Sequence, residues 1–305
     1  MGRERPPVRD VRGVLLLDKP RGVTSNHALQ RAKRLFQAAK AGHTGSLDPL
    51  ATGMLPICFG AATKLSSFLL DASKRYRVSA ELGVATTTGD AEGEIIERRP
   101  EPVPSAGEVS AALATLTGEI EQVPPMYSAL KRDGVPLYRL ARRGVEVPRE
   151  PRRVTVYSID LEGFNWPILD FTVSCSKGTY VRTIVTDAAA AMGTVGHVRE
   201  LRRLSVAPFA ESDMRTFEVL ETALQDGGQA GLDAALRPLD AALPDWPRVT
   251  LDAGAAERLL HGQTVASRPG APLGWTRIYT ESGALIALGE VTAAGELAPR
   301  RVFGT

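Results

Sequence analysis

One carboxylate stands alone in a loop-forming stretch near the N-terminus. Residues 42–53 read Gly-His-Thr-Gly-Ser-Leu-Asp-Pro-Leu-Ala-Thr-Gly, and Asp48 is the only acidic residue between Asp18 and Asp71. Because glycine permits positive φ and proline fixes φ, this stretch predicts a shaped loop. An isolated acid on such a loop, close to His43, is suited to act as a nucleophile or a general acid/base. A turn in which Asp48 only caps the following segment explains these residue types equally well.

Composition limits the setting in which this acid works. The 305 residues suggest about two domains, and no apolar run is long enough for a transmembrane helix. Segment 1–12 is charged, lacks the apolar stretch of a secretion signal, and is expected to be a short flexible arm. Cys58 and Cys175 are far apart without a CxxC partner, and the four histidines are scattered. We therefore expect a cytoplasmic protein with buried thiols and no metal site.

The net charge of +2 conceals an uneven distribution. Residues 1–210 carry 29 basic and 22 acidic residues, whereas residues 211–305 carry 8 basic and 13 acidic ones. Eight of the basic residues fall within segment 131–153. Such a cluster is able to hold phosphates, although a solvated, arginine-rich loop is the more common explanation for a charge cluster taken alone.

Strands and helices must position these groups, and hydrophobic periodicity indicates where they lie. Residues 76–84 alternate apolar and polar side chains, which predicts a half-buried strand with Tyr76 at its beginning. A second alternating strand, 169–175, leads through a turn at Gly178 into an alanine-rich helix, so Arg182 lies at a strand-to-helix transition. Further predicted elements are a strand at 13–17, a helix from Thr24 or Ser25 to about Lys40, and a helix from a capping box at Ser105 to about Gly118. Strands and helices without regular alternation predict an α+β domain.

The C-terminal part is predicted to be a separate β-rich module. Pro244-Asp245-Trp246-Pro247 has the composition of a boundary. The elements expected beyond it are a helix at about 253–260 and strands at 276–280, 285–291 and 301–303.

The order of residues at 42–56 resembles the central motif of the TruB family of tRNA pseudouridine synthases. Five further segments resemble TruB motifs in the same order along the chain. They are Gly-Val-Leu-Leu-Leu-Asp-Lys-Pro at 13–20, Lys-Arg-Tyr-Arg-Val at 74–78, Pro-Met-Tyr-Ser-Ala-Leu-Lys at 125–131, Ser-Lys-Gly-Thr-Tyr-Val-Arg at 176–182 and Leu-Arg-Arg-Leu at 201–204. Ordered motifs across nearly the whole chain make chance agreement very unlikely.

This resemblance implies the fold and the reaction. The implied fold is the α+β pseudouridine synthase fold, with a mixed, mainly antiparallel central sheet flanked by helices. The implied domains are a catalytic domain at 13–245, with an RNA-contacting basic segment at about 124–153, and a PUA-like RNA-binding domain at 248–305. The implied activity is isomerisation of uridine to pseudouridine at position 55, in the T loop of tRNA, by base flipping. Because the base itself carries the atoms needed, no cofactor or metal is expected, and nothing demands more than a monomer.

The resemblance also implies roles for individual residues. Asp48 becomes the catalytic acid, Tyr76 the ring that stacks on uracil and offers a hydroxyl for proton transfer, and Arg182 the partner of Asp48. A guanidinium can hold a carboxylate in bidentate geometry, which is the geometry expected for Arg182 and Asp48. The expected substrate-binding residues are Tyr180 and Leu201 in the base pocket, His43 beside the flipped nucleotide, Lys64 against an acid or phosphate, and Lys19 in the adjacent turn. The expected contacts to the RNA backbone are Lys131, Arg142, Arg143, Arg31 and Arg34.

Several alternatives stay open at this point. Asp48 attacks C1′ of the sugar, attacks C6 of the base, or promotes elimination to a glycal. A non-catalytic RNA-binding or tRNA-folding protein on the same scaffold should lack Asp48, Tyr76 or Arg182, and all three are present. Relatives in guide-RNA complexes usually carry basic extensions, which are not evident here. A glycoside hydrolase would need a second pocket acid, and the central motif shows none.

Overall fold

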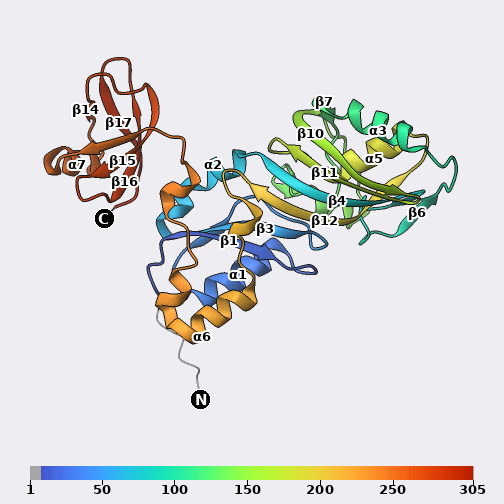
Figure 1. The fold of residues 1–305 in the computed structure, drawn as a ribbon, viewed down its shortest axis with the longest axis horizontal. Coiled ribbons are helices and arrows are strands. Elements are labelled where there is room, and N and C mark those ends of the chain that lie inside the picture. Colours follow the sequence, from blue (N-terminus) through green and yellow to red (C-terminus); the bar gives the residue numbers. More distant parts are fainter. Residues whose placement is uncertain (1–7, 305) are drawn as a thin grey trace.

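The larger part of the computed structural model, which describes residues 8–304, is built on one eight-stranded sheet (Figure 1). Its order is β1-β3-β12-β4-β11-β10-β7, with β2 paired to β3. The strands are β1 (Gly13–Lys19), β2 (Ala41–His43), β3 (Thr52–Phe59), β4 (Lys74–Leu82), β7 (Gly118–Gln122), β10 (Arg152–Asn165), β11 (Ile168–Cys175) and β12 (Gly196–Val206). Among these strands of the described residues, β3 and β12 form the only parallel pair. The expected mixed, mainly antiparallel sheet is confirmed.

Most of the helices pack apolar residues against the sheet. The helices of this part are α1 (Ser25–Leu35), α2 (Ser66–Asp71), α3 (Ala106–Thr115), α4 (Leu137–Ala141), α5 (Val181–Ala191) and α6 (Phe217–Asp233), with 3₁₀ turns η1 (Gly60–Leu65), η2 (Glu211–Asp213) and η3 (Leu239–Ala242). Apolar residues of α3 and α5 join those of β4 and β11 in the main core. Burial of this kind supplies most of the stability of a helix in a protein.

The N-terminal ends of the helices follow the sequence signals, whereas one C-terminal end does not. Ser105 caps α3 as expected, accepting from the Glu108 backbone N at 3.3 Å while its own N–H donates to the Glu108 carboxylate at 2.7 Å. The prediction that the first helix runs to about Lys40 is wrong, since α1 ends at Leu35. The chain turns back through Gln37, at φ 52°, so that β2 can pair with β3.

The expected N-terminal arm is only partly described. Residues 1–7 lie outside the described residues. Arg9 is attached to the body: its N–H donates to Gln37 O at 2.7 Å, and its side chain forms an ion pair with Asp233 of α6. Val11 is buried in the main core. From residue 9 onward the chain therefore packs against the larger part of the structure rather than forming a free arm.

A small second sheet forms the C-terminal module. It has the order β13-β15-β16-β17-β14 and its own apolar core, to which α7 (Ala253–Leu260) contributes. The strands are β13 (Arg248–Leu251), β14 (Val265–Ala266), β15 (Gly274–Thr280), β16 (Leu285–Val291) and β17 (Glu296–Val302). The expectation of a PUA-like module is confirmed. The last strand begins at Glu296 rather than at 301, because Pro299 and a register shift disturb the alternation that would have revealed it.

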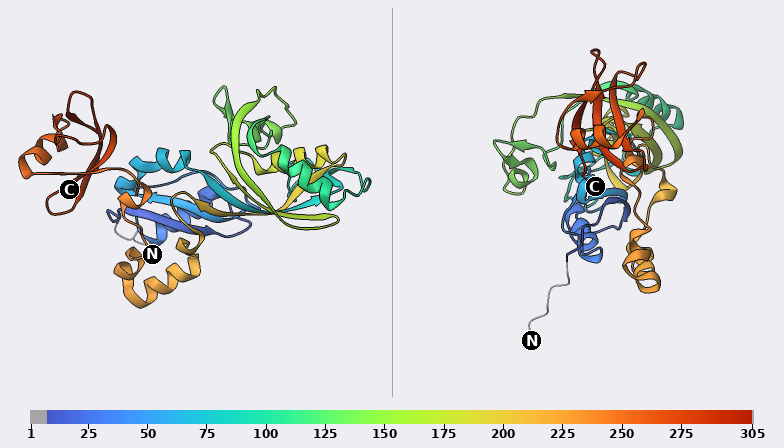
Figure 2. Two further views of the ribbon diagram at one scale, coloured as in Figure 1. Left: turned by 45° about the horizontal axis from the view of Figure 1, so that its top comes forward. Right: turned by 90° about the vertical axis from the view of Figure 1, so that its left-hand side faces the viewer.

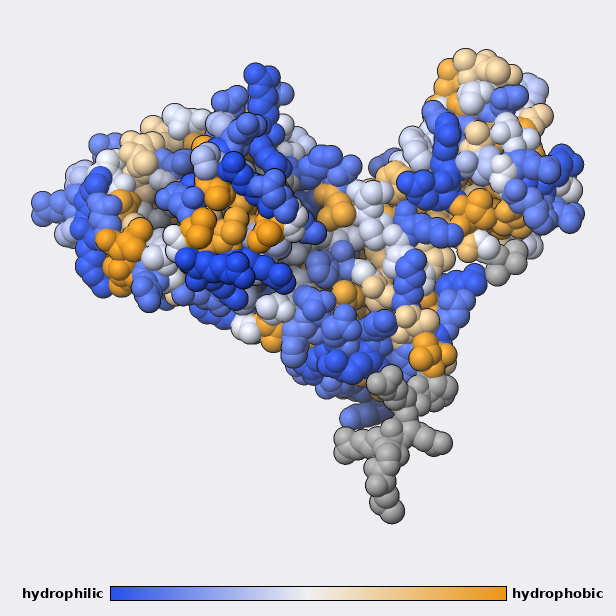
Figure 3. Space-filling model, turned by 180° about the vertical axis from the view of Figure 1, so that it is seen from behind, coloured by the Kyte–Doolittle hydropathy of each residue, from blue (hydrophilic) through white to orange (hydrophobic). Residues whose placement is uncertain are grey.

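Aromatic side chains join the module to the larger part. Phe68 of α2 meets Trp246 at 5.0 Å and Trp275 at 5.5 Å between ring centroids, both edge-on. Leu288 and Phe303 of the module are buried in a core that also contains Met54 of the main sheet. Above this junction a notch separates the two lobes, as the face in Figure 3 shows.

The basic segment 131–153 stands away from the sheet. It contains the short strand pair β8 (Lys131–Arg132) and β9 (Val135–Pro136) and then α4. This green part of the chain projects to one side in the right-hand view of Figure 2. A second short pair, β5 (Val84–Thr86) with β6 (Ile95–Arg98), extends the far end of the body. Within residues 8–304, no helix is long and apolar enough to cross a membrane.

Gly53 joins the two halves of the sheet. It lies at φ 96°, where β3 pairs with Arg203 of β12, and a Cβ built on it would sit 2.2 Å from the Arg203 carbonyl oxygen. Only glycine lets the two backbones approach this closely.

Replacing Gly53 with alanine should therefore destabilise the protein by more than about 2 kcal/mol, because the side chain adds both a clash and backbone strain. Gly42→Ala is the matched control, since its Cβ would meet nothing within 4 Å and its φ is not positive. That control should change the free energy of unfolding by less than about 0.5 kcal/mol. Denaturant unfolding measures both values. Equal free energies of unfolding for Gly53→Ala and Gly42→Ala would contradict the explanation given for Gly53 at the β3–β12 pairing.

Candidate active site

Five of the residues singled out from the sequence line one pocket of about 290 Å³: Asp48, Tyr76, Tyr180, Arg182 and Leu201. They come from the loop before β3, from β4, from the start of α5 and from β12. Segments far apart in the sequence therefore meet at one place, beside the seam where β3 pairs with β12.

The loop that carries Asp48 is held by buried polar side chains. The Ser25 hydroxyl of α1 accepts from Leu47 N at 2.8 Å and donates to Leu47 O at 3.0 Å. The Lys19 ammonium donates to Val23 O at 2.8 Å and reaches Pro49 O at 3.5 Å. Burial lowers the pKa of Lys19 to about 8, with Asp48 acting in the opposite direction. Lys19 thus holds the turn, while its expected contact with the substrate stays a prediction.

Arg182 divides its guanidinium between two carboxylates. Its Nη2 lies 3.1 Å from Asp48 Oδ2, and its Nη1 lies 3.6 Å from Asp90 Oδ2. The same nitrogens donate to the carbonyl oxygens of Tyr127 at 2.7 Å and Thr88 at 2.9 Å. The structure brings Arg182 to Asp48 as expected, but the expected bidentate geometry is wrong, because Nη1 is turned to Asp90.

Asp48 faces the pocket as a carboxylate with an altered acidity. Burial raises its pKa above the ordinary value, Arg182 and Lys19 act to lower it, and Asp90 adds to the rise. Its side chain still keeps 41% of its surface exposed, against 7% for that of Arg182. The carboxylate is therefore reachable from the pocket, while its counter-ion forms the wall behind it.

Sequence reasoning missed the second carboxylate, Asp90. It is 4% exposed, and its Oδ1 accepts from the Thr88 hydroxyl at 2.6 Å and from Glu92 N at 3.1 Å. The sequence shows this stretch as a glycine-flanked turn, and an acid between glycines was the available signal. Asp90 is not among the residues lining the pocket and serves to balance Arg182.

Tyr76 and Tyr180 form aromatic walls beside Asp48. Burial raises the pKa of Tyr76, Arg203 acts to lower it, and Asp48 acts to raise it, so the phenol keeps its proton near neutral pH. Tyr180 precedes α5, and its backbone is fixed by Gln122 of β7, whose side chain accepts from Tyr180 N at 3.0 Å and donates to Tyr180 O at 3.3 Å. Burial raises the pKa of the Tyr180 phenol as well, so both hydroxyls keep their protons near neutral pH.

Arg203 is a further pocket residue that sequence reasoning did not single out. It is 1% exposed, donates from Nε to Met54 O at 2.6 Å and from Nη2 to Gly45 O at 3.1 Å, and lines the same pocket. The signal was its place two residues after Leu201 on one strand, which puts both side chains on the same face of the sheet.

His43 lies at the end of β2, beside the pocket rather than in its lining. Its Nδ1 is buried and finds no hydrogen-bond partner among residues 8–304. Burial lowers the pKa of the ring, and Arg203 lowers it further, so His43 is neutral near neutral pH. A neutral ring is suited to stacking rather than to charge pairing.

Two expected RNA or substrate contacts are engaged elsewhere. The Lys64 ammonium donates to the Val302 carbonyl of the C-terminal module and does not reach the pocket, because η1 carries it toward β17. Arg31 of α1 pairs with Glu221 of α6 at 2.7 Å and lies over the Phe217 ring at 4.0 Å. These side chains fasten parts of the protein together.

The other basic residues that were expected to contact the RNA backbone lie at the surface. Arg34, Lys131, Arg142 and Arg143 are exposed. Tyr138 lies in α4 and Arg142 caps its C-terminal end, and the Arg142 guanidinium lies 5.7 Å from the centroid of the Tyr138 ring. The basic segment therefore presents both charge and an aromatic ring at the surface.

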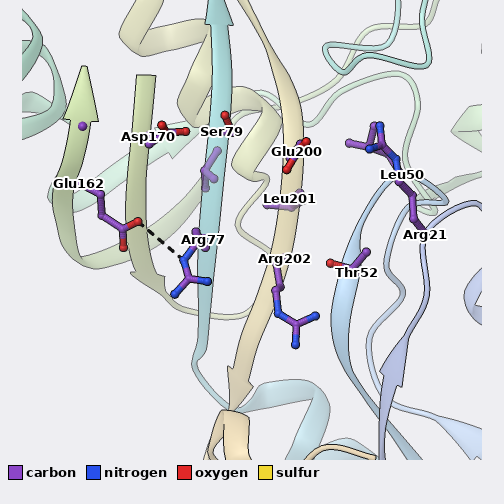
Figure 4. A pocket seen from close by; sticks show the side chains of 12 residues that line it. Arg21, Leu50, Thr52, Arg77, Ser79, Glu162, Asp170, Glu200, Leu201 and Arg202 are labelled. Atoms are coloured by element: carbon purple, nitrogen blue, oxygen red, sulfur yellow. Dashed lines mark ion pairs between the residues drawn. The ribbon is translucent and has the colours of Figure 1, made fainter. Parts of the chain in front are cut away.

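A larger hollow, of about 500 Å³, lies on the other face of the sheet (Figure 4). Arg77 and Ser79 of β4 reach it, and these residues face the opposite side of the strand from Tyr76. Leu201 lines both this hollow and the pocket of Asp48. Figure 4 shows Arg77 paired with Glu162, at 3.7 Å. Charges of both signs balance each other there, and none of the expected catalytic residues lines it.

Comparison with known protein families agrees with this geometry. Residues 33–181 match the TruB family pseudouridylate synthase N-terminal domain. Residues 182–244 match the tRNA pseudouridylate synthase B C-terminal domain, and residues 247–303 match the C-terminal domain of pseudouridine synthase II TruB.

Individual relatives are similar over nearly their whole length. The chain is 50% identical to tRNA pseudouridine synthase B of Pseudomonas aeruginosa (strain UCBPP-PA14), over 97% of each chain. It is 53% identical to the protein of that name from Methylobacillus flagellatus, over 97% of this chain and 96% of that one. Among solved structures, it resembles a chain from a Cbf5-Nop10-Gar1 complex with a TM-score of 0.73 and 26% identity, over 95% of this chain and 84% of that one.

The acidity of Asp48 leads to a prediction about stability. Because its pKa in the folded protein is raised above 3.8, the folded state binds more protons than the unfolded state between those two values. Stability is therefore lost as pH rises through that window, and ionised Asp48 costs folding free energy at neutral pH. Asp48→Asn should raise the melting temperature at pH 7, and this gain should shrink as the pH falls toward 4.

Asp226→Asn, a change to an exposed aspartate of α6, is the control and should leave the melting temperature nearly unchanged at both pH values. Thermal unfolding of the wild type and both variants, followed by circular dichroism at the two pH values, gives these changes in melting temperature. A lower melting temperature for Asp48→Asn at pH 7 would show that Asp48 stabilises the fold, against this reasoning.

Proposed function

Since the chain belongs to the TruB family of pseudouridine synthases, we propose that it converts uridine to pseudouridine at position 55, in the T loop of tRNA. It is an isomerase that acts on uridine in tRNA. The observation that carries the proposed mechanism is the meeting of Asp48, Tyr76 and Arg182 in one pocket. The reaction needs no cofactor and no metal, and the protein acts as a monomer in the cytoplasm, where tRNA is found.

The pocket suits a base that has been turned out of the RNA. The target lies in a folded loop, so it must leave the stack before Asp48 can reach it. Tyr76, Tyr180 and Leu201 provide flat and apolar walls for the base. His43, neutral and beside the loop, fills the space that the nucleotide leaves in the RNA.

Asp48 carries the central step, and Arg182 keeps it in its reactive form. A carboxylate beside a guanidinium is held ionised and oriented, which is what a nucleophile or an electrostatic stabiliser of a sugar cation needs. During the isomerisation the N1–C1′ bond breaks and a C5–C1′ bond forms, while C5 loses a proton and N1 gains one. The atoms balance within the substrate, so no external reagent enters.

The basic segment at about 124–153 and the C-terminal module at 248–305 hold the tRNA outside the pocket. We assign residues 13–245 to catalysis and residues 248–305 to RNA binding. Within residues 13–245, the projecting basic segment contacts phosphates through Lys131, Arg142 and Arg143, and Arg34 adds a further contact. These charges make the binding salt-dependent.

Asp48→Asn tests the catalytic assignment, because it keeps the size of the side chain and removes its charge. We expect no pseudouridine at position 55 of a T-arm stem–loop transcript under single-turnover conditions, with affinity for the transcript within a few fold of the wild type. Asp226→Asn should react at the wild-type rate. If Asp48→Asn forms pseudouridine at more than a small fraction of the wild-type rate, Asp48 has no part in the mechanism. If the wild type modifies other uridines instead of position 55, the proposed target is refuted.

Neutralising Arg142 and Arg143 together tests the grip on RNA. Arg142→Gln/Arg143→Gln should weaken tRNA binding and reduce the log–log slope of affinity against salt by about 1 for each lost phosphate contact. The matched control is Arg98→Gln/Arg99→Gln, another adjacent exposed pair at the end of β6, which the proposal does not place on RNA. Filter binding at several salt concentrations measures the slopes. The same slope for the first double variant and the wild type would mean that the segment is only a solvated loop.

A further inference from the structure

Arg203 is a buried cation that has no carboxylate partner in the described part of the chain. Its acceptors are main-chain oxygens, Met54 O at 2.6 Å and Gly45 O at 3.1 Å, and it forms no ion pair within residues 8–304. A buried charge is normally paired, since leaving it unpaired costs several kcal/mol. Arg203 is one of the residues around the pocket that Asp48 and Tyr76 line.

The other cations near the pocket differ from Arg203 in their partners. Arg182 is balanced by Asp48 and Asp90. The Lys19 ammonium donates to carbonyl oxygens at 2.8 and 2.9 Å, and it does not line the pocket. Lys74 lines the pocket, but its ammonium is turned to carbonyl oxygens at the end of α2, among them Leu70 O at 2.6 Å. Arg203 is thus the pocket-lining arginine whose charge no acid balances.

The reaction generates negative charge where this cation lies. When the N1–C1′ bond breaks by displacement or elimination, both electrons of the bond stay on N1, and the resulting uracil anion shares its charge with O2 and O4. When Asp48 instead adds to C6, the C5–C6 electron pair moves toward C5 and O4. Each of the three open routes therefore builds up negative charge on the uracil before the new C5–C1′ bond forms.

We infer that Arg203 is a positioning residue whose charge, transmitted through the Tyr76 hydroxyl, stabilises the uracil as it becomes anionic. Arg203 and Tyr76 are direct partners across β12 and β4, with both side chains on the pocket face. Arg203 is 1% exposed and lies beneath the pocket surface, whereas the Tyr76 ring borders it. Burial raises the pKa of the Tyr76 phenol, and the Arg203 guanidinium acts on the phenol to lower it. A hydroxyl under such an influence is polarised toward donation, which is the arrangement of a charge-stabilising donor in a dry site. The same guanidinium holds the Gly45 carbonyl and thereby the loop of Asp48.

The inference rests on the proposed roles of Asp48 and Tyr76 and is tested by changing the leaving group. Fluorine at C5 withdraws electrons, so 5-fluorouracil carries negative charge more easily than uracil and needs less help from the protein. The measurement is the single-turnover rate of N1–C1′ cleavage in T-arm transcripts that carry uridine or 5-fluorouridine at the target position. The variants are Arg203→Gln, which keeps hydrogen bonding without charge, and Arg203→Lys, which keeps the charge.

We expect Arg203→Gln to slow cleavage of the uridine transcript about 100-fold, the size found for loss of one charge-stabilising donor. The slowing with 5-fluorouridine should be clearly smaller, so the ratio of the two rates shifts toward the fluorinated substrate. Arg203→Lys should retain the wild-type ratio even if both rates fall. Equal slowing of both substrates by both variants would overturn the inference and leave Arg203 only a support for the loop.

Two further variants separate charge from structure. Arg202→Gln changes the neighbouring arginine, which pairs with Asp18 and Glu211 on the other face of the strand, and should leave the ratio unchanged. Tyr76→Phe keeps Arg203 in place and should shift the ratio in the same direction as Arg203→Gln, and the double variant should shift it little further. A wild-type ratio for Tyr76→Phe would overturn the route through the hydroxyl, even if Arg203→Gln fails to fold. Failure of the wild type to modify the uridine transcript would refute the proposed function instead.

Discussion

The constraint behind this structure is that a carboxylate must stay charged inside a protein pocket. Burial raises the pKa of Asp48, so without compensation the group would tend toward its unreactive, protonated form. Arg182 supplies the compensation at 3.1 Å, but it is itself buried and needs partners. Asp90 and the carbonyls of Thr88 and Tyr127 meet that need. The acid that we propose as catalytic is therefore linked to the arrangement of three other segments.

The way in which the other cations are satisfied keeps the pocket positive. Lys19, Lys74 and Arg203 all donate to main-chain carbonyl oxygens. These carbonyls satisfy the hydrogen-bond donors of the cations without adding a negative charge. A carboxylate in any of these places would repel both Asp48 and the phosphates of the substrate. The same bonds hold the Asp48 loop and the end of α2, so stability and electrostatics come from the same contacts. Gly53 makes the arrangement possible, because it lets the Arg203 backbone lie against β3.

The sequence predicted the parts whose signals are local. The helix at 253–260, the capping box of Ser105 and the place of Arg182 at the start of α5 each follow from residues within one or two turns. β12 was not predicted, because bulges after Val198 and Arg203 break its alternation. Ordered motifs brought Asp48, Tyr76 and Arg182 together, whereas Asp90 and Arg203 escaped notice. Their roles depend on contacts with carbonyls and charges from distant segments, which no local pattern records.

The discovery of Asp90 bears on why this pocket isomerises and does not hydrolyse. A glycoside hydrolase needs two acids facing its substrate, one of them protonated to release the leaving group. Asp90 acts to raise the pKa of Asp48, yet it pairs with Arg182 and is only 4% exposed. Its carboxylate oxygens accept from the Thr88 hydroxyl and Glu92 N and face the guanidinium. Among the described residues, Asp90 is not one of those that line the pocket. In the proposed mechanism, one acid faces the sugar and aromatic walls surround the base, so the pocket would hold the cleaved uracil beside C1′ and rejoining through C5 becomes the available outcome.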